Sequence, residues 1–268
     1  MKNLLLPLCL LLFQVSFAQQ QLKDKFDYEV TYELTYRIDS THLEEEKKEF
    51  MILYIGKGLS VFSSRAKTLV SQFIIRGNMG HTNREALTDF LFVTLKSRET
   101  GKIYSTVDLS GDLFYYEEDL ALFDWQIHPE TRLIKGYQAQ KATTDFAGRS
   151  YVAWFTPEVP VPEGPYKFNG LPGLILEIAD TQQHWVFTFT GLEKLTPPKD
   201  FKVNFRQYIA LEKEPLMERF NTYRMDPMGY SLAQGRGKNV SVQPRDLKKL
   251  AAAFAERAAK MNNPLELK

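Results

Sequence analysis

The sequence predicts a mainly β protein built on a single antiparallel sheet, either curved or closed into a partly open barrel, with a few packed helices. Residues 26–38 alternate between apolar and polar side chains, which is typical of a long, half-buried antiparallel strand. Short segments of strand-forming residues, separated by turns that contain glycine, continue to residue 205. Helical periodicity is clear only after Pro244, so few helices are expected.

In the first strand, the apolar residues at positions 26, 28, 30, 32, 34, 36 and 38 share one face. Further strand segments are predicted at 50–55, 59–63, 102–107, 113–117, 125–127, 131–134, 137–144, 151–155, 174–179, 185–192 and 201–205. We expect the domain to contain roughly nine to eleven strands. Between residues 65 and 98 the composition changes to alanine, leucine and charged residues without proline, which predicts one or two helices. A C-terminal amphipathic helix is predicted from apolar residues three and four apart, at Leu247, Leu250, Phe254, Ala258 and Met261. Pro264 should prevent it from continuing.

The N-terminus has the features of a secretory signal. Lys2 supplies a positive charge, residues 4–13 form an apolar core, and Ser16 and Ala18 supply small residues before a cleavage site. The apolar run is too short to cross a bilayer of about 30 Å as a helix. We therefore predict cleavage after Ala18, which leaves residues 19–268 as one β-rich domain of 250 residues.

Cysteine content and charge exclude several functions. Cys9 is the only cysteine and lies in the signal, so the mature chain can form neither a disulfide nor a cysteine-based site. After cleavage, basic and acidic residues balance at 33 each, which argues against nucleic acid as a partner. No later segment approaches 18 consecutive apolar residues. The prediction is an exported protein, periplasmic or associated with the outer membrane.

The most informative stretch is 164–178, GPYKFNGLPGLILEI. Its glycines at 164, 170 and 173 allow positive φ or a close approach of another segment, and its prolines at 165 and 172 mark two turns. The structural interpretation is a rigid double turn that sets the register of the following strand; its residues are Gly164, Pro165, Gly170, Leu171, Pro172, Gly173, Leu174 and Ile175. The functional alternative is a loop where missing side chains let a partner reach the backbone.

This stretch and its surroundings resemble the GLPGLI family, which is named for the hexapeptide at 170–175. Supporting segments are Gln140-Lys141-Ala142, Phe146-Ala147-Gly148-Arg149, Ala153-Trp154-Phe155-Thr156, Glu158-Val159-Pro160 and the ending Asn263-Pro264-Leu265-Glu266-Leu267-Lys268. The resemblance implies an exported protein of Bacteroidetes-type bacteria, without an established reaction. Members often have a cysteine just before the Gln-Lys-Ala step, where this chain has Ala139.

No spaced catalytic or metal-binding set is visible, so we predict no catalytic residue, no metal site and no cofactor. The mature histidines, at positions 42, 81, 128 and 184, lack the pairwise spacing of a zinc or copper motif. There is no Gly-x-Ser-x-Gly motif for a hydrolase nucleophile. A hydrolase remains the alternative only if carboxylates such as Glu158, Glu163 and Glu177 meet in the fold.

Aromatic residues make up 13% of the chain, and most are expected in the core of the sheet. Trp154, Tyr166 and Phe168 flank the proline and glycine turns, where the mouth of an apolar pocket could open. These three are the candidate binding residues. The predicted function is a non-enzymatic binding or chaperone-like protein for an apolar small molecule or an outer-membrane protein. A further alternative is a structural envelope protein that pairs with a partner through an exposed edge strand.

Overall fold

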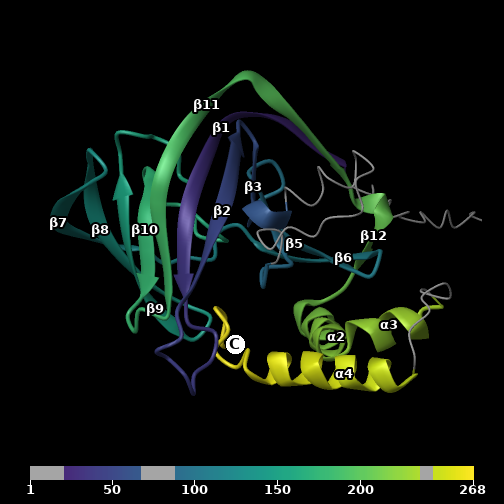
Figure 1. The fold of residues 1–268 in the computed structure, drawn as a ribbon. Coiled ribbons are helices and arrows are strands. Elements are labelled where there is room, and N and C mark those ends of the chain that lie inside the picture. Colours follow the sequence, from purple (N-terminus) through teal and green to yellow (C-terminus); the bar gives the residue numbers. More distant parts are fainter. Residues whose placement is uncertain (1–20, 68–87, 236–243) are drawn as a thin grey trace, which may run out of the picture.

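The computed structural model describes residues 21–67, 88–235 and 244–268. Twelve strands of these residues form one sheet in the order β12-β6-β5-β4-β3-β2-β1-β11-β10-β9-β8-β7 (Figure 1). Neighbouring strands are antiparallel except for β12, which runs parallel to β6. The strands are β1 (Gln21–Tyr36), β2 (Lys47–Gly56), β3 (Leu59–Ser64), β4 (Val93–Ser97), β5 (Lys102–Leu109), β6 (Asp112–Asp119), β7 (Gln126–Ile134), β8 (Tyr137–Phe146), β9 (Arg149–Thr156), β10 (Leu174–Asp180), β11 (Trp185–Asn204) and β12 (Tyr208–Ala210).

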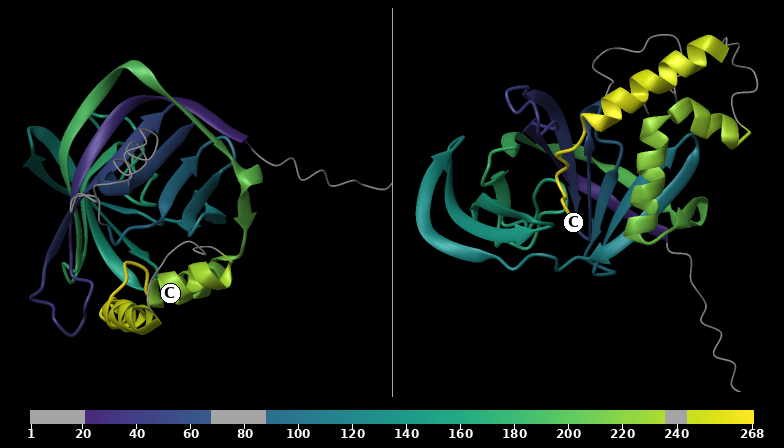
Figure 2. Two further views of the ribbon diagram at one scale, coloured as in Figure 1. Left: turned by 45° about the vertical axis from the view of Figure 1, so that its right-hand side comes forward. Right: turned by 90° about the horizontal axis from the view of Figure 1, so that it is seen from below.

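The sheet is strongly curved but does not close into a barrel. Its two longest strands, β1 and β11, pair over most of their length and arch across the molecule (Figures 1 and 2). Register shifts in β1 next to Phe26 and Thr31 mark bulges, which bend a strand and increase its twist. The bending produces a concave face that holds the main hydrophobic core.

Three helices lie on the open side of the sheet, α2 (Lys213–Met225), α3 (Pro227–Ala233) and α4 (Pro244–Ala259) (Figure 2). The apolar residues Leu216 and Phe220 of α2 pack against β5 and β6. After α4, the last residues of the chain turn back under the sheet, where Figure 1 marks the C-terminus. None of these helices is long and apolar enough to cross a membrane.

The alternation read from residues 26–38 is the pattern of the core. Val30, Tyr32 and Leu34 are fully buried, and they join the main core cluster with residues of β2, β9, β10 and β11. Phe26 is also buried but belongs to a second cluster, with Val203 and Phe205, beyond the bulge. A protein without disulfides in its described part is thus held together by contacts between large side chains on one face of the sheet.

The structure confirms the predicted fold class and the C-terminal helix, and it corrects some elements. The prediction of helices between residues 65 and 98 is wrong at Val93–Ser97, which form β4, a buried strand; residues 68–87 of that prediction lie outside the described residues. The two segments at 125–134 are one strand, β7, that is irregular around Pro129. The segments at 185–192 and 201–205 are joined in β11. The helices α2 and α3 were not predicted, because their sequences show no strong apolar periodicity.

Candidate functional site

The glycine- and proline-rich stretch forms a compact loop between β9 and β10. Hydrogen bonds from Gly170 N to Pro162 O (3.1 Å) and from Ile175 N to Glu163 O (2.9 Å) close it at its base. A third bond, from Phe168 N to Pro165 O (3.1 Å), forms the turn at its tip. The loop is therefore fixed by its own backbone before any side chain is considered.

Two glycines are required by the path of the backbone. Gly170 has φ of +94°, which L-residues rarely adopt. At Gly173 a Cβ atom would lie 2.0 Å from the carbonyl oxygen of Thr156 in β9, so only glycine lets the loop pass so close to the neighbouring strand. Both the positive φ and the close approach that the sequence predicts for these glycines are present.

A buried lysine on β4 pins the loop to the sheet. Lys96 has no exposed surface, and its Nζ donates to the carbonyl oxygens of Gly164 (2.8 Å) and Phe168 (3.1 Å). It also pairs with Glu163 at 2.8 Å, and the other oxygen of that carboxylate pairs with Arg98 at 2.6 Å. Burial lowers the pKa of Lys96, while Glu163 opposes this shift. All three donors of the ammonium group are used, so the lysine acts as a structural pin rather than as a free reactive amine.

Of the three candidate aromatic residues, the structure brings Tyr166 and Phe168 together and places Trp154 elsewhere. Phe168 is fully buried at the centre of an aromatic cluster. Its ring neighbours, at centroid distances of 4.9 to 6.5 Å, are Tyr151, Phe123, Phe146, Tyr166 and Trp125. Phe168 therefore packs against the neighbouring rings and has no exposed surface that a ligand could contact.

Trp154 lies on the opposite face of β9. The alternate residues Tyr151, Ala153 and Phe155 fill the core, so Trp154 points outward. There the guanidinium of Arg132 stacks on its ring at 4.2 Å and pairs with Glu177 at 2.6 Å. Trp154 thus shares no cavity with Tyr166 or Phe168.

Apart from Gly170, the residues that line the cavity beside the loop were not singled out by the sequence. The cavity is an open groove of about 650 Å³, lined by Gly101, Asp119, Leu120, Ala121, Phe123, Trp125, Asn169 and Gly170. Cavities of about 300 to 1,000 Å³ with apolar and aromatic walls are typical of small-molecule sites. We name it the motif groove. Its motif residue is Gly170, where the absent side chain leaves the wall open beside the indole of Trp125.

The walls of the motif groove are held rigidly. Trp125 Nε1 donates to the carbonyl oxygen of Asn169 (2.8 Å), and Asn169 Nδ2 donates to the carbonyl oxygen of Leu120 (3.2 Å). On the rim, Asp119 is 2.6 Å from Lys102 and its side chain is largely exposed. Because the polar groups are already paired, the groove offers mainly apolar contact. Phe123 and Trp125, two residues apart at the start of a predicted strand, are the signal that could have identified it.

A second buried lysine lies within the loop itself. Lys167 has no exposed surface, and its Nζ contacts Glu118, Glu266 (2.5 Å) and the hydroxyl of Tyr116 (3.1 Å). Burial would lower the pKa of Lys167, but Tyr116, Glu266 and Glu118 outweigh it and raise that pKa. Tyr166, the preceding residue, has φ of +54°, which is uncommon for a bulky residue. The lysine is therefore a permanent buried cation that the surrounding structure has been shaped to hold.

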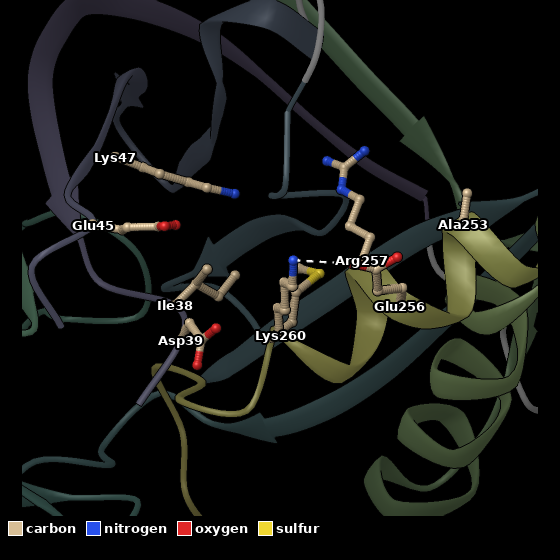
Figure 3. Close-up of a pocket in the computed structure, with 9 residues that line it drawn as sticks. Ile38, Asp39, Glu45, Lys47, Ala253, Glu256, Arg257 and Lys260 are labelled. Carbon is tan, nitrogen blue, oxygen red and sulfur yellow. Dashed lines mark ion pairs between the residues drawn. The ribbon is translucent and has the colours of Figure 1, made fainter. Parts of the chain in front are cut away.

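A smaller cavity of about 290 Å³ lies between the start of β2 and α4 (Figure 3). Lys47 and Glu45 reach it from one side, and Arg257 of α4 and Lys260, just after α4, reach it from the other. Lys47 and Arg257 are both committed to the buried carboxylate of Asp89, at 2.9 and 2.5 Å. Charges of both signs line this cavity, and its donors Lys47 and Arg257 are already paired with Asp89. These ion pairs attach α4 to the sheet, so the cavity is a poor candidate for a binding site.

The carboxylates considered for hydrolysis do not meet. Glu163 is buried between Lys96 and Arg98, Glu177 pairs with Arg132 on the outer face, and Glu158 accepts a hydrogen bond from Gln138 N at 2.6 Å. Among the described residues, no group of three or more histidine, cysteine, aspartate or glutamate side chains could hold a metal ion. His81 lies outside the described residues.

The edge strand β7 tests the alternative of strand addition. Ile127 and Leu133 are exposed on it, to 48% and 70%. However, Pro129 lacks a donor, and the pairing with β8 is irregular between Ile127 and Thr131. Proline and irregular pairing are features that protect edge strands against adding a further strand.

Comparisons with known proteins find a family of unknown function and a likeness in fold. A family model described as "Protein of unknown function (Porph_ging)" matches residues 147–177. A search of curated proteins finds no match. Among solved structures, the chain is similar to PNGF-II in a P21 crystal form, with a TM-score of 0.52 and 14% identity over 75% of this chain and 34% of that one. PNGF-II in a C2 form gives a TM-score of 0.48 and 16% identity, over 72% and 32% of the two chains. The chain thus spans about a third of the length of PNGF-II, and at this identity the likeness shows the fold alone.

Proposed function

We propose that this chain is an exported, non-enzymatic binding protein of the bacterial envelope that holds an apolar small molecule in the motif groove. The observation that carries this proposal is the groove of about 650 Å³ between Phe123, Trp125 and Gly170. A groove with aromatic walls, placed against a glycine without a side chain, is the arrangement expected for shape-based recognition of an apolar ligand.

The walls favour an apolar ligand over a charged one. The carbonyl oxygen of Asn169 accepts from the indole of Trp125, and Asp119 pairs with Lys102 on the exposed rim of the groove. A ligand would therefore gain most from burying apolar surface, at about 25 cal/mol per Å², so that 200 Å² against the rings contributes about 5 kcal/mol before the costs of association.

The envelope location rests on the N-terminal signal and on the GLPGLI resemblance. Cleavage after Ala18 would leave Gln19 as the first residue, preceding β1. The family model that matches residues 147–177 is of unknown function, so it neither adds a reaction nor removes one. N-terminal sequencing of protein purified from its host should begin at Gln19; a chain that begins at Met1 in the cytoplasm would refute this part of the proposal.

The binding proposal is tested with two tryptophan variants that differ in position. Trp125→Ala opens the motif groove, whereas Trp154→Ala removes a ring of the same kind from the opposite face of the sheet. The probe is the fluorescent dye 1-anilinonaphthalene-8-sulfonate, titrated into folded protein. We expect Trp125→Ala to weaken dye binding about tenfold, which corresponds to about 1.4 kcal/mol, and Trp154→Ala to leave it unchanged.

Each outcome decides between the two aromatic sites. Loss of binding in Trp154→Ala alone would overturn the motif groove and favour the outer face. Equal binding in both variants and in the wild type would refute both sites. Circular dichroism on each variant controls for unfolding, since Trp125 also donates to the loop through Nε1. Native mass spectrometry of protein from its host, purified without detergent, then identifies any resident ligand by mass.

A further inference from the structure

The last six residues of the chain lie in a groove as a bound peptide would. Residues 263–268 follow α4 and belong to neither a helix nor a strand of the sheet. Nevertheless, Asn263 and Leu265 are buried, at 6% and 7% exposure, while Pro264 and Leu267 between and after them face outward. The side chain of Glu266 is also mostly buried, and the backbone bends at residues 263 and 265, so the segment follows an irregular path along which the protein holds three of its side chains.

The body of the protein holds the backbone of this tail without regard to its sequence. Three successive carbonyl oxygens, of Asn263, Pro264 and Leu265, accept hydrogen bonds from side chains of the sheet. The donors are Trp185 Nε1 (3.2 Å), Arg149 Nη2 (2.7 Å) and Tyr151 Oη (3.1 Å). The amides of Asn263 and Leu267 donate to carbonyl oxygens of residues 38 and 147, both at 2.9 Å or less. Backbone recognition of this kind provides affinity for any segment whose backbone can follow the same path.

Two side chains of the tail add specificity. The side-chain amide of Asn263 accepts a hydrogen bond from Arg149 Nη2 through Oδ1 (2.5 Å) and donates one to Arg37 O through Nδ2 (2.6 Å). Arg149 is itself buried and is held by Asp180 at 3.1 Å. Buried, charge-assisted contacts of this type discriminate strongly, because a side chain without the amide would leave the guanidinium partly unpaired.

The second specific contact is Glu266, three residues after Asn263. Its carboxylate receives Lys167 Nζ and Tyr166 Oη at 2.5 Å each, and it pairs with Lys213 at 2.7 Å. Without Glu266, this pocket would contain two lysines and the single carboxylate of Glu118. A net positive, mostly buried pocket requires an anion, so the groove is built to receive a carboxylate at this position.

We propose that this groove is a peptide-binding site whose resident occupant is the tail, and that it accepts in trans a peptide with a side-chain amide three residues before a carboxylate. The site is distinct from the motif groove and does not rest on the function proposed above. The loop between β9 and β10 separates the two sites, since its Lys167 contacts the tail and its Gly170 lines the motif groove. A partner that presents such a segment competes with the tail for the same contacts.

The test weakens the tail and supplies the peptide separately. In the full-length chain, Asn263→Ala with Glu266→Ala removes both specific contacts but leaves the groove intact. The probe is the fluorescently labelled hexapeptide Asn-Pro-Leu-Glu-Leu-Lys, and the readout is its anisotropy. A tethered tail competes at an effective concentration in the millimolar range, so the peptide should bind the double variant at least about tenfold more tightly than the wild type.

A second peptide, with alanine in place of its asparagine and glutamate, is the matched control. It should bind the double variant at least about tenfold more weakly than the native peptide, and only the native peptide should raise the melting temperature. The proposal is overturned if both peptides bind alike, or if neither binds a double variant that is folded by circular dichroism. Should the double variant not fold, the isosteric Glu266→Gln provides the same comparison with the same two outcomes.

Discussion

Replacing Gly173 with alanine tests whether this glycine is needed for the loop between β9 and β10 to pass close to β9. The added Cβ would lie 2.0 Å from Thr156 O, 2.6 Å from Thr156 C and 3.0 Å from Pro157 Cα. All three are backbone atoms, and Thr156 is paired with Leu174 in the sheet, so no flexible side chain can move aside. Overpacking of this kind costs about 1 to 3 kcal/mol, and the unfavourable φ adds about 1 kcal/mol. We expect a total loss of about 3 kcal/mol.

The assay is equilibrium unfolding in urea together with a thermal melt. For a domain of this size, 3 kcal/mol corresponds to a fall in melting temperature of about 6 to 12 °C. Gly136→Ala is the matched control, because Gly136 also has positive φ (+91°) but nothing lies within 4 Å of its Cβ position. It should cost about 1 kcal/mol. If Gly173→Ala costs no more than Gly136→Ala, the close approach to β9 is not what the glycine provides.

Two further predictions concern the buried charges. Lys96→Met should destabilise the fold by about 3 kcal/mol, because Glu163 loses a partner and two loop carbonyls lose their donor. The control Lys102→Met removes an exposed ion pair and should cost less than about 1 kcal/mol. Equal losses of stability in urea unfolding would contradict the role of Lys96 in holding the loop. Burial would raise the pKa of Glu266, but Lys167 and Lys213 outweigh burial and lower that pKa below its usual value near 4. The contribution of the Glu266 carboxylate to stability is therefore complete at neutral pH and is lost as the pH falls through the lowered pKa. In Glu266→Gln the fall in melting temperature between about pH 5 and pH 3 should therefore be shallower than in the wild type, and parallel curves would refute the assignment.

Much of the fold could be predicted because the strands carry a period of two. Residues 26–38 alternate so regularly that β1 and its buried face follow directly from the sequence. Where the prediction failed, tertiary context decides the structure. Residues 93–97 were assigned to a helical region by composition, yet they form β4 because they fit between β3 and β5 in the sheet. Residues 125–134 and 185–205 were each divided into two predicted strands, but β7 and β11 continue through the prolines at 129, 197 and 198.

The candidate aromatic site could not be resolved from sequence because β9 is apolar on both faces. Tyr151, Ala153 and Phe155 face the core, but Val152 and Trp154 on the other face are equally apolar, so alternation does not tell which set is inside. A shift of one residue would exchange the two faces. Trp154 therefore seemed as suitable for a pocket as Phe168, although the sheet separates them.

The buried lysines were missed for a different reason. A lysine is almost always expected on the surface, and Lys96 and Lys167 carry no local sign of their partners. Glu266 lies 99 residues after Lys167, and Glu163 lies 67 residues after Lys96. Charge pairs between such distant residues exist only once the sheet has curved, so patterns in single segments cannot reveal them. The position of Lys167 between two aromatic residues was the one local hint.

These contacts also explain why the stretch that is most distinctive in sequence carries so little visible chemistry. Residues 147–177, which the family model matches, supply Ala147 O, Arg149 and Tyr151 to the tail, Lys167 to Glu266, and Gly170 to the motif groove. Most of these groups act by holding another part of the chain through hydrogen bonds, and glycine acts by having no side chain. The binding that we propose depends largely on backbone carbonyls, on buried charged side chains and on open space. A scan for nucleophiles, acids, bases or metal ligands therefore passes over the residues that we propose as binding residues.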